Sequence, residues 1–150
     1  MTDMLITARH ALPLLAVAQA QKELTHNEAL TLIDALVHSA VEAGPINDPP
    51  SDPAPGQCWL VGDNATGGWH DHAKAIALWT VGGWRFAAPR AGMIVTRLTD
   101  RARLRFDDGA WVEPRPIAVP SGGSTIDAEA RSALAKLILH LAAQGLLISG

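Results

Sequence analysis

The sequence predicts an α+β fold with N-terminal helices, a small antiparallel β-hairpin domain rich in Trp and Gly, and a C-terminal helix. Three observations support it. Apolar residues recur at helical spacing near both ends, alternating segments flank two-residue turns in the middle, and two Pro-rich stretches separate these blocks. The expected division is a helical segment at 1–43, a linker at 44–56, a β domain at 57–113, a linker at 114–125 and a helix at 126–150.

The N-terminal block is expected to form two helices, over about residues 13–24 and 26–42. Pro13 suits the first turn of a helix because its missing N–H has no partner there. The stretch from Thr25 to Glu28 has the pattern of a capping box, in which each of these two side chains accepts a hydrogen bond from the other residue's amide. The pattern predicts a bend at Thr25; a single unbroken helix is the alternative.

The β domain contains two hairpin signals. Val81-Gly82 lies between strand candidates 75–80 and 84–88, and Asp108-Gly109, a strong type I′ turn pair, lies between 103–107 and 110–113. With two-residue loops, an aromatic pair faces across each hairpin, which stabilises it by roughly 0.2–1 kcal/mol. The pairs are Trp79 with Trp84 and Phe106 with Trp111.

Strand alternation also assigns faces in the first hairpin. Trp79, Trp84 and Phe86 share one face, and Ile76 and Leu78 share the other. Most of the five Trp are therefore expected to be structural anchors.

The C-terminal helix is expected to begin at a Thr125 or Asp127 cap and to end at Gly145. Its apolar stripe is predicted to be an oligomerisation surface, although its period does not set the number of copies. The stripe comprises Leu134, Leu137, Ile138 and Leu141. The apolar tail at 146–148 is expected to dock on this chain or on a partner.

Composition excludes several functional classes. A net charge of −3 argues against a general nucleic-acid binder, and the single Cys58 forbids an intramolecular disulfide and disfavours a Cys-based zinc site. The N-terminus lacks a secretory signal pattern, and the most apolar window, 134–148, is interrupted by Lys136 and His140 and is too short to span a membrane. We expect no membrane insertion, no cofactor, and synthesis in the bacterial cytoplasm.

Residues that could carry chemistry are few. His70-Asp71-His72 resembles a metal cluster, but a third protein ligand is not evident, which favours a polar loop. No nucleophile elbow, phosphate loop or dinucleotide pattern is present, so a non-enzymatic protein is expected, with a small hydrolase as a minor alternative.

Contact with a ligand or partner is the remaining possibility. The Arg-rich stretch around 97–105 is either a solvated strand face or a contact with an acidic surface, such as an anionic polysaccharide. Trp69, beside Gly67-Gly68, is predicted to be the most exposed Trp, and a row of exposed Trp would stack on sugars. The contact candidates are Trp69, His70, His72, Arg97, Arg103 and Arg105.

Several motifs resemble an uncharacterised domain family found in phages, prophages and gene transfer agents of alphaproteobacteria. The resemblance covers roughly residues 10 to 113, and the stretch from Gln19 to Leu30 is its most specific part. The remaining matches are Pro55-Gly56 with Trp59 to Gly62, Ala65 to Gly67 with Trp69, Ile76-Ala77 with Trp79, Gly82 to Trp84 with Phe86, Pro89, Gly92-Met93, and Asp108-Gly109 with Trp111.

The resemblance implies a virion structural role, as a spike or fibre component on a head or tail, with no catalytic residues. Head spikes of gene transfer agents help the particle adhere to the capsular polysaccharide of recipient cells. It implies a particle location, with a head spike favoured over a tail, and partners among capsid or other spike and fibre proteins. A homo-oligomeric spike base or adaptor is favoured; a carbohydrate-binding module using Trp and Arg residues is the alternative.

Overall fold

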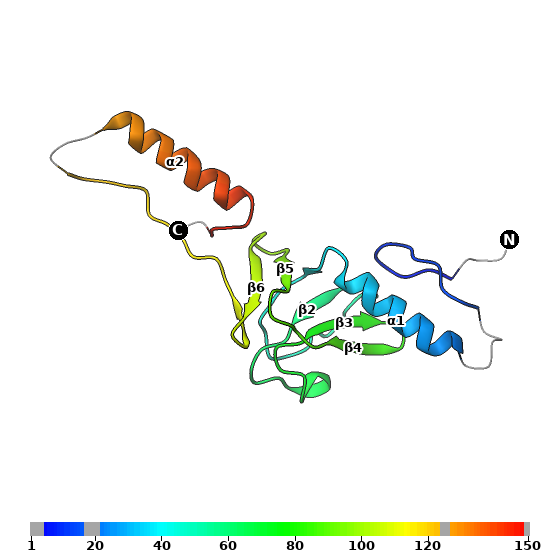
Figure 1. The fold of residues 1–150 in the computed structure, drawn as a ribbon. Helices are drawn as coiled ribbons and strands as arrows, with labels where there is room; N and C mark the ends of the chain where they lie inside the picture. The colour runs from blue at the N-terminus through cyan, green and yellow to red at the C-terminus, as the bar shows by residue number, and fades with distance from the viewer. Residues whose placement is uncertain (1–4, 17–21, 124–126, 149–150) are drawn as a thin grey trace.

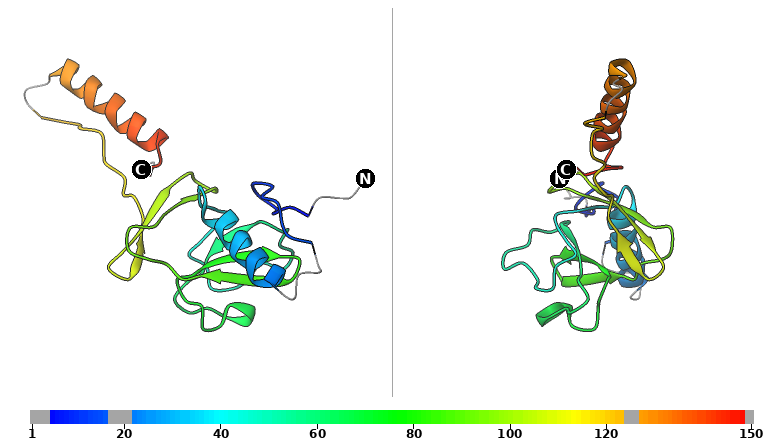
Figure 2. Two further views of the ribbon diagram at one scale, coloured as in Figure 1. Left: turned by 45° about the vertical axis from the view of Figure 1, so that its right-hand side comes forward. Right: turned by 90° about the vertical axis from the view of Figure 1, so that its left-hand side faces the viewer.

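The computed structural model describes residues 5–16, 22–123 and 127–148, and it confirms the α+β class. Helix α1 (Lys22–Leu36) lies alongside a three-stranded sheet, and a four-stranded sheet lies next to it (Figure 1). Helix α2 (Ala128–Ala143) lies apart from both sheets, at the opposite end of the molecule from the N-terminal segment (Figure 2). In the part of the chain that the structure describes, no helix is both long and apolar enough to cross a membrane.

The three-stranded sheet is antiparallel and contains the first predicted hairpin. Its strands are β2 (Cys58–Leu60), β3 (Ile76–Thr80) and β4 (Gly83–Ala87), in that order. Trp79 pairs with Trp84 and Thr80 with Gly83, so the two-residue loop and the predicted register are confirmed. The left-handed backbone conformation at this turn is adopted by Gly83, with φ +95°, the residue that follows the Val81-Gly82 loop.

The four-stranded sheet has the order β1-β5-β6-β7, and β1 runs parallel to β5 while the other pairs are antiparallel. Its strands are β1 (Ala40–Val41), β5 (Ile94–Arg97), β6 (Arg103–Asp107) and β7 (Ala110–Val112). Phe106 pairs with Trp111 across the second predicted hairpin. Asp108 and Gly109 have φ of 45° and 75°, which confirms the expected type I′ turn.

Alternation along β3 places its residues on the two predicted faces, and each face packs into a separate cluster. Ile76 and Leu78 face a core shared by both sheets, which also contains Val41, Leu60, Val95 and Leu104. The opposite face carries Trp79, with Trp84 and Phe86, against a second cluster around Trp59 and Trp69. Trp111 joins the four-stranded sheet to the segment that precedes β3, because its Nε1 donates a 2.8 Å hydrogen bond to the carbonyl of Lys74.

The N-terminal block differs from the two predicted helices. Pro13 forms an isolated antiparallel bridge with Ile6, so residues 13–16 are not helical, and residues 17–21 lie outside the described residues. Helix α1 continues through Thr25, so the capping box and bend predicted there are wrong. The helix ends at Leu36, before His38 with φ +46°, and fully buried Val41 then pairs with β5 instead of extending the helix.

Both predicted ends of α2 are confirmed where the structure describes them. Asp127 caps the first turn by accepting a 2.9 Å hydrogen bond from the Ala130 amide, while Thr125 lies outside the described residues. Gly145 has φ +69°, and the amides of Gly145 and Leu146 donate to the carbonyls of Ala142 and Leu141. This is the Schellman arrangement, which satisfies carbonyls at a helix C-terminus.

Candidate functional site

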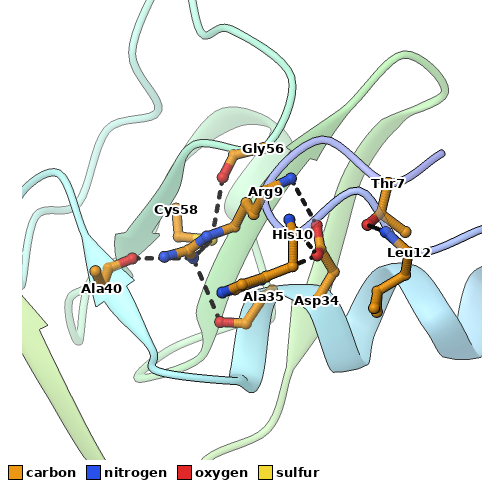
Figure 3. Close-up of polar contacts among 9 residues, drawn as sticks. All are labelled: Thr7, Arg9, His10, Leu12, Asp34, Ala35, Ala40, Gly56 and Cys58. Carbon is orange, nitrogen blue, oxygen red and sulfur yellow. Dashed lines mark hydrogen bonds and ion pairs between the residues drawn. The ribbon is translucent and has the colours of Figure 1, made fainter.

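Two polar side chains on one face of α1 hold the N-terminal arm, which we define as residues 5–16. Asn27 receives a hydrogen bond from the Leu15 amide and donates one to the Leu15 carbonyl, both at 2.9 Å. Asp34, two helical turns further on, accepts hydrogen bonds from the amides of Arg9 at 2.9 Å and His10 at 2.8 Å (Figure 3). At these two residues α1 therefore holds the arm through the arm's backbone.

The Asp34 carboxylate is only 3% exposed and lies 3.0 Å from the His10 ring. Burial on its own raises the pKa of Asp34. The hydrogen bonds donated by the Arg9 amide, the Thr7 hydroxyl, and the amide and ring of His10 outweigh that effect, so the pKa of Asp34 lies below its ordinary value. Asp34 is consequently a charged anchor.

Arg9 extends from the arm into the interior beside Cys58. Its Nη1 donates to the carbonyls of Ala35 and Ala40 at 3.4 and 3.2 Å, and it lies 3.3 Å from the Cys58 Sγ (Figure 3). Burial raises the pKa of the Cys58 thiol, and the nearby Arg9 guanidinium only partly opposes this. Cys58 is thus a buried, protonated thiol, which is poorly suited to act as a nucleophile.

Trp69 is fully buried, contrary to the prediction that it is the most exposed Trp. It ends the 3₁₀ turn η1 (Gly67–Trp69), which directs its side chain inward against Trp84 at a centroid separation of 5.1 Å. Trp84 also contacts Trp59 at 5.7 Å and Trp79 at 4.8 Å, all in edge-to-face geometry. Four of the Trp therefore form one structural cluster, which removes Trp69 as a surface contact.

The two predicted His contacts have different partners. His70 is exposed and lies 3.0 Å from Asp71, whereas the His72 ring stacks on Phe86 with centroids 3.6 Å apart and an interplanar angle of 6°. Within the described residues, no group of three or more His, Cys, Asp or Glu side chains could hold a metal ion. The two His residues therefore do not converge on a ligand site.

The predicted Arg contacts divide into one structural residue and two exposed residues. Arg97 is 13% exposed at its side chain and binds Asp100, Glu113 and the Gly44 carbonyl. The hydrogen bonds to Asp100 and Glu113 raise the pKa of the Arg97 guanidinium, and the hydrogen bond from Arg97 lowers the pKa of Asp100. Arg103 and Arg105 are exposed on β6, opposite buried Leu104 and Phe106, as the strand alternation predicted.

Helix α2 exposes its apolar residues. None of its 16 residues is buried, and Leu134, Leu137 and Leu139 are 45%, 54% and 68% exposed. Ile138 and Leu141, the other members of the predicted stripe, are half-buried. The tail docks on this chain, because the Gly145 carbonyl accepts a 2.9 Å hydrogen bond from the Arg103 amide and Ile148 packs against the main core.

A groove runs between α1 and the β3–β4 hairpin, which we call the α1–hairpin groove. Its inner cavity, of about 220 Å³, is lined in part by the N-terminal arm, and its outer cavity, of about 410 Å³, lies towards the start of α1. Thr31, Thr80 and Gly82 line both cavities, so the two lie side by side. Glu23, Glu28 and Arg85 line the outer cavity, and Glu28 pairs with Arg85 at 3.4 Å.

Sequence reasoning missed the residues that hold the arm and the groove that the arm borders. Asn27 and Asp34 share one helix face, and polar residues at that spacing could have signalled a polar contact. Their partners are backbone amides, which leave no trace in the sequence.

Residues 26–112 match a family model described as "Protein of unknown function (DUF2793)". The matched stretch begins inside α1, ends at the last residue of β7, and contains both sheets. It leaves the N-terminal arm and α2 outside. No curated protein matches the chain.

Proposed function

The chain belongs to the DUF2793 family of unknown function, and we propose that it is a structural subunit of a virion-like particle. Specifically, it would be a head-spike base or adaptor subunit of a gene transfer agent or phage-like particle, supporting attachment to a host surface. It would act as a homo-oligomer that contacts capsid, spike or fibre proteins. The resemblance of its motifs to proteins of phages and gene transfer agents supports this proposal.

The exposed apolar surface of α2 carries the proposal. A helix with no buried residue gains no stability from its own chain's core, yet α2 is capped at both ends and tied to β6 by its tail. Exposed apolar area is unfavourable by roughly 25 cal/mol per Å², and association removes it from water. A capped and tethered helix with exposed Leu residues therefore suits an assembly element.

Two measurements test this role. Sedimentation velocity over a range of protein concentrations should reveal an oligomer, and replacing both Leu137 and Leu141 with Lys should yield monomers with unchanged circular dichroism. Particles purified from the source cells should contain the chain after gradient centrifugation. A wild-type chain that stays monomeric at every concentration and is absent from particles would refute the proposal.

Polysaccharide binding is a second candidate, favoured by one observation. Arg103 and Arg105 are both exposed on β6, and Arg105 pairs with Asp107 at 2.7 Å, which leaves Arg103 as the freer cation. Capsular polysaccharide pull-down with Arg103→Ala tests this candidate, and Arg115→Ala, a change of an exposed Arg outside the sheets, is the control. Equal retention of wild type and Arg103→Ala on an acidic polysaccharide would exclude a role for Arg103.

A further inference from the structure

We propose that α2 of one copy docks in the α1–hairpin groove of the next copy, so that the chain assembles head to tail. This inference rests on the proposed function and specifies its interface. It follows the helix-in-groove mode, in which an amphipathic helix places its apolar face in a groove of the partner.

The inner cavity of the groove is suited to apolar side chains. The hydroxyl of Thr31 donates to the Asn27 carbonyl and that of Thr80 to the Gly83 carbonyl, both at 2.7 Å, and Asp34 is occupied by the arm. Because these polar groups are already bonded, the cavity offers an incoming group mainly apolar contacts. Val81 at its rim is 93% exposed and Ile6 is 48% exposed. Leu137 and Leu134 of a second copy provide the matching surface.

The outer cavity adds an acidic partner for a cation on α2. Glu23 lines it, and the Glu23 Oε2 is buried without a hydrogen-bond partner among the residues that the structure describes. Lys136, which precedes Leu137 in the sequence and flanks its face of the helix, is exposed and has no ion-pair partner within residues 5–16, 22–123 and 127–148. The Lys136 ammonium of a second copy would donate a charge-assisted hydrogen bond to this Glu23 oxygen.

The arrangement of the chain requires that the contact be made between copies. The α1–hairpin groove lies beside the N-terminal arm, and α2 lies at the other end of the molecule (Figure 1, Figure 2). The tail holds the C-terminal end of α2 near β6 through Gly145 and Arg103. A contact between two different patches is heterologous, so it closes into a ring or continues as a filament.

Mixing two defective variants distinguishes this contact from a bundle of α2 helices. Val81→Lys places a charge at the groove rim, and because Val81 is 93% exposed, it is expected to leave the fold intact. Leu137→Lys alters only the helix. Each variant alone should be monomeric, and their mixture should form a 1:1 complex that grows no further, measured by light scattering after size exclusion. In a bundle of α2 helices, Val81→Lys would assemble like the wild type.

A charge exchange supplies the second test. Glu23→Lys and Lys136→Glu should each weaken association by about tenfold, and the double variant should restore it, because each contact again joins opposite charges. Leu139→Lys, on the face of α2 away from Leu134 and Leu137, is the matched control for Leu137→Lys and should assemble normally.

The outcomes separate the two proposals. A monomeric wild type would overturn both. A wild-type oligomer that tolerates Val81→Lys and Glu23→Lys would overturn head-to-tail docking and leave the assembly role intact. An unrestored double variant would overturn the pairing of Glu23 with Lys136.

Discussion

Replacing Asp34 with Ala tests how the N-terminal arm is held. The change removes the acceptor for the Arg9 and His10 amides and a buried carboxylate that is 3% exposed. An unpaired buried donor costs about 1–3 kcal/mol of stability. Detachment of the arm would return its amides to water and so recover part of this cost. Two such donors would cost about 2–6 kcal/mol, and because rehydration of the arm recovers part of this, we expect the free energy of unfolding to fall by about 2–4 kcal/mol.

Urea denaturation measures the loss, and hydrogen exchange locates it. The amides of Arg9 and His10 should lose their protection from exchange. The amides of β3 and β4 should lose only as much protection as the fall in the global free energy of unfolding requires. Asp52→Ala, at an exposed position, is the matched control and should change stability by less than about 0.5 kcal/mol. A loss under about 0.5 kcal/mol for Asp34→Ala, or unchanged protection of the two amides, would refute the anchor role.

The stabilisation by Asp34 also depends on pH. The pKa of Asp34 is below its ordinary value of 3.8 in the folded chain, so the folded state prefers the ionised form. Its contribution is complete above the unfolded pKa and is lost as the pH falls through the folded pKa. The stability difference between wild type and Asp34→Ala should therefore shrink as the pH falls below about 4; a constant difference would contradict the charged-anchor assignment.

Three other perturbations follow from the contacts described above. Trp84→Ala removes the shared partner of Trp59, Trp69 and Trp79. It should lower the free energy of unfolding measured by urea denaturation by about 3 kcal/mol. A loss below about 1 kcal/mol would mean that the cluster repacks around the cavity. Cys58, with its raised pKa, should react with a thiol-specific disulfide reagent at pH 8 only after urea is added; rapid reaction of the folded chain would contradict its burial. Arg97→Ala leaves the Gly44 carbonyl, Asp100 and Glu113 without their common donor and should lower the thermal midpoint of unfolding. Arg103→Ala, at an exposed position, is the control and should leave the midpoint unchanged. Equal midpoints for the two variants would show that the Arg97 contacts contribute nothing to stability.

The two hairpins and α2 could be predicted because local rules determine them. A two-residue loop fixes the register of its strands, so Val81-Gly82 and Asp108-Gly109 were enough to pair Trp79 with Trp84 and Phe106 with Trp111. The cap at Asp127 is equally local.

The N-terminal block was mispredicted because tertiary contacts override its local pattern. The capping pattern at Thr25 lies inside α1, and Ala40-Val41 leaves the helix to pair with β5. Trp69 was assigned to the surface because Gly67-Gly68 indicates a loop, but the 3₁₀ turn directs its side chain into the Trp cluster. In both places long-range contacts determine the conformation, and a single sequence does not show them.

The docked tail gives α2 a second attachment to the body of the molecule. The chain leaves the four-stranded sheet after β7, forms α2, and returns to β6 of the same sheet through the Gly145–Arg103 hydrogen bond and the packing of Ile148. A force applied to the helix is thereby divided between a covalent connection and a non-covalent one on neighbouring strands. Under tension the tail contact would release first and lengthen the reach of α2 without unfolding either sheet.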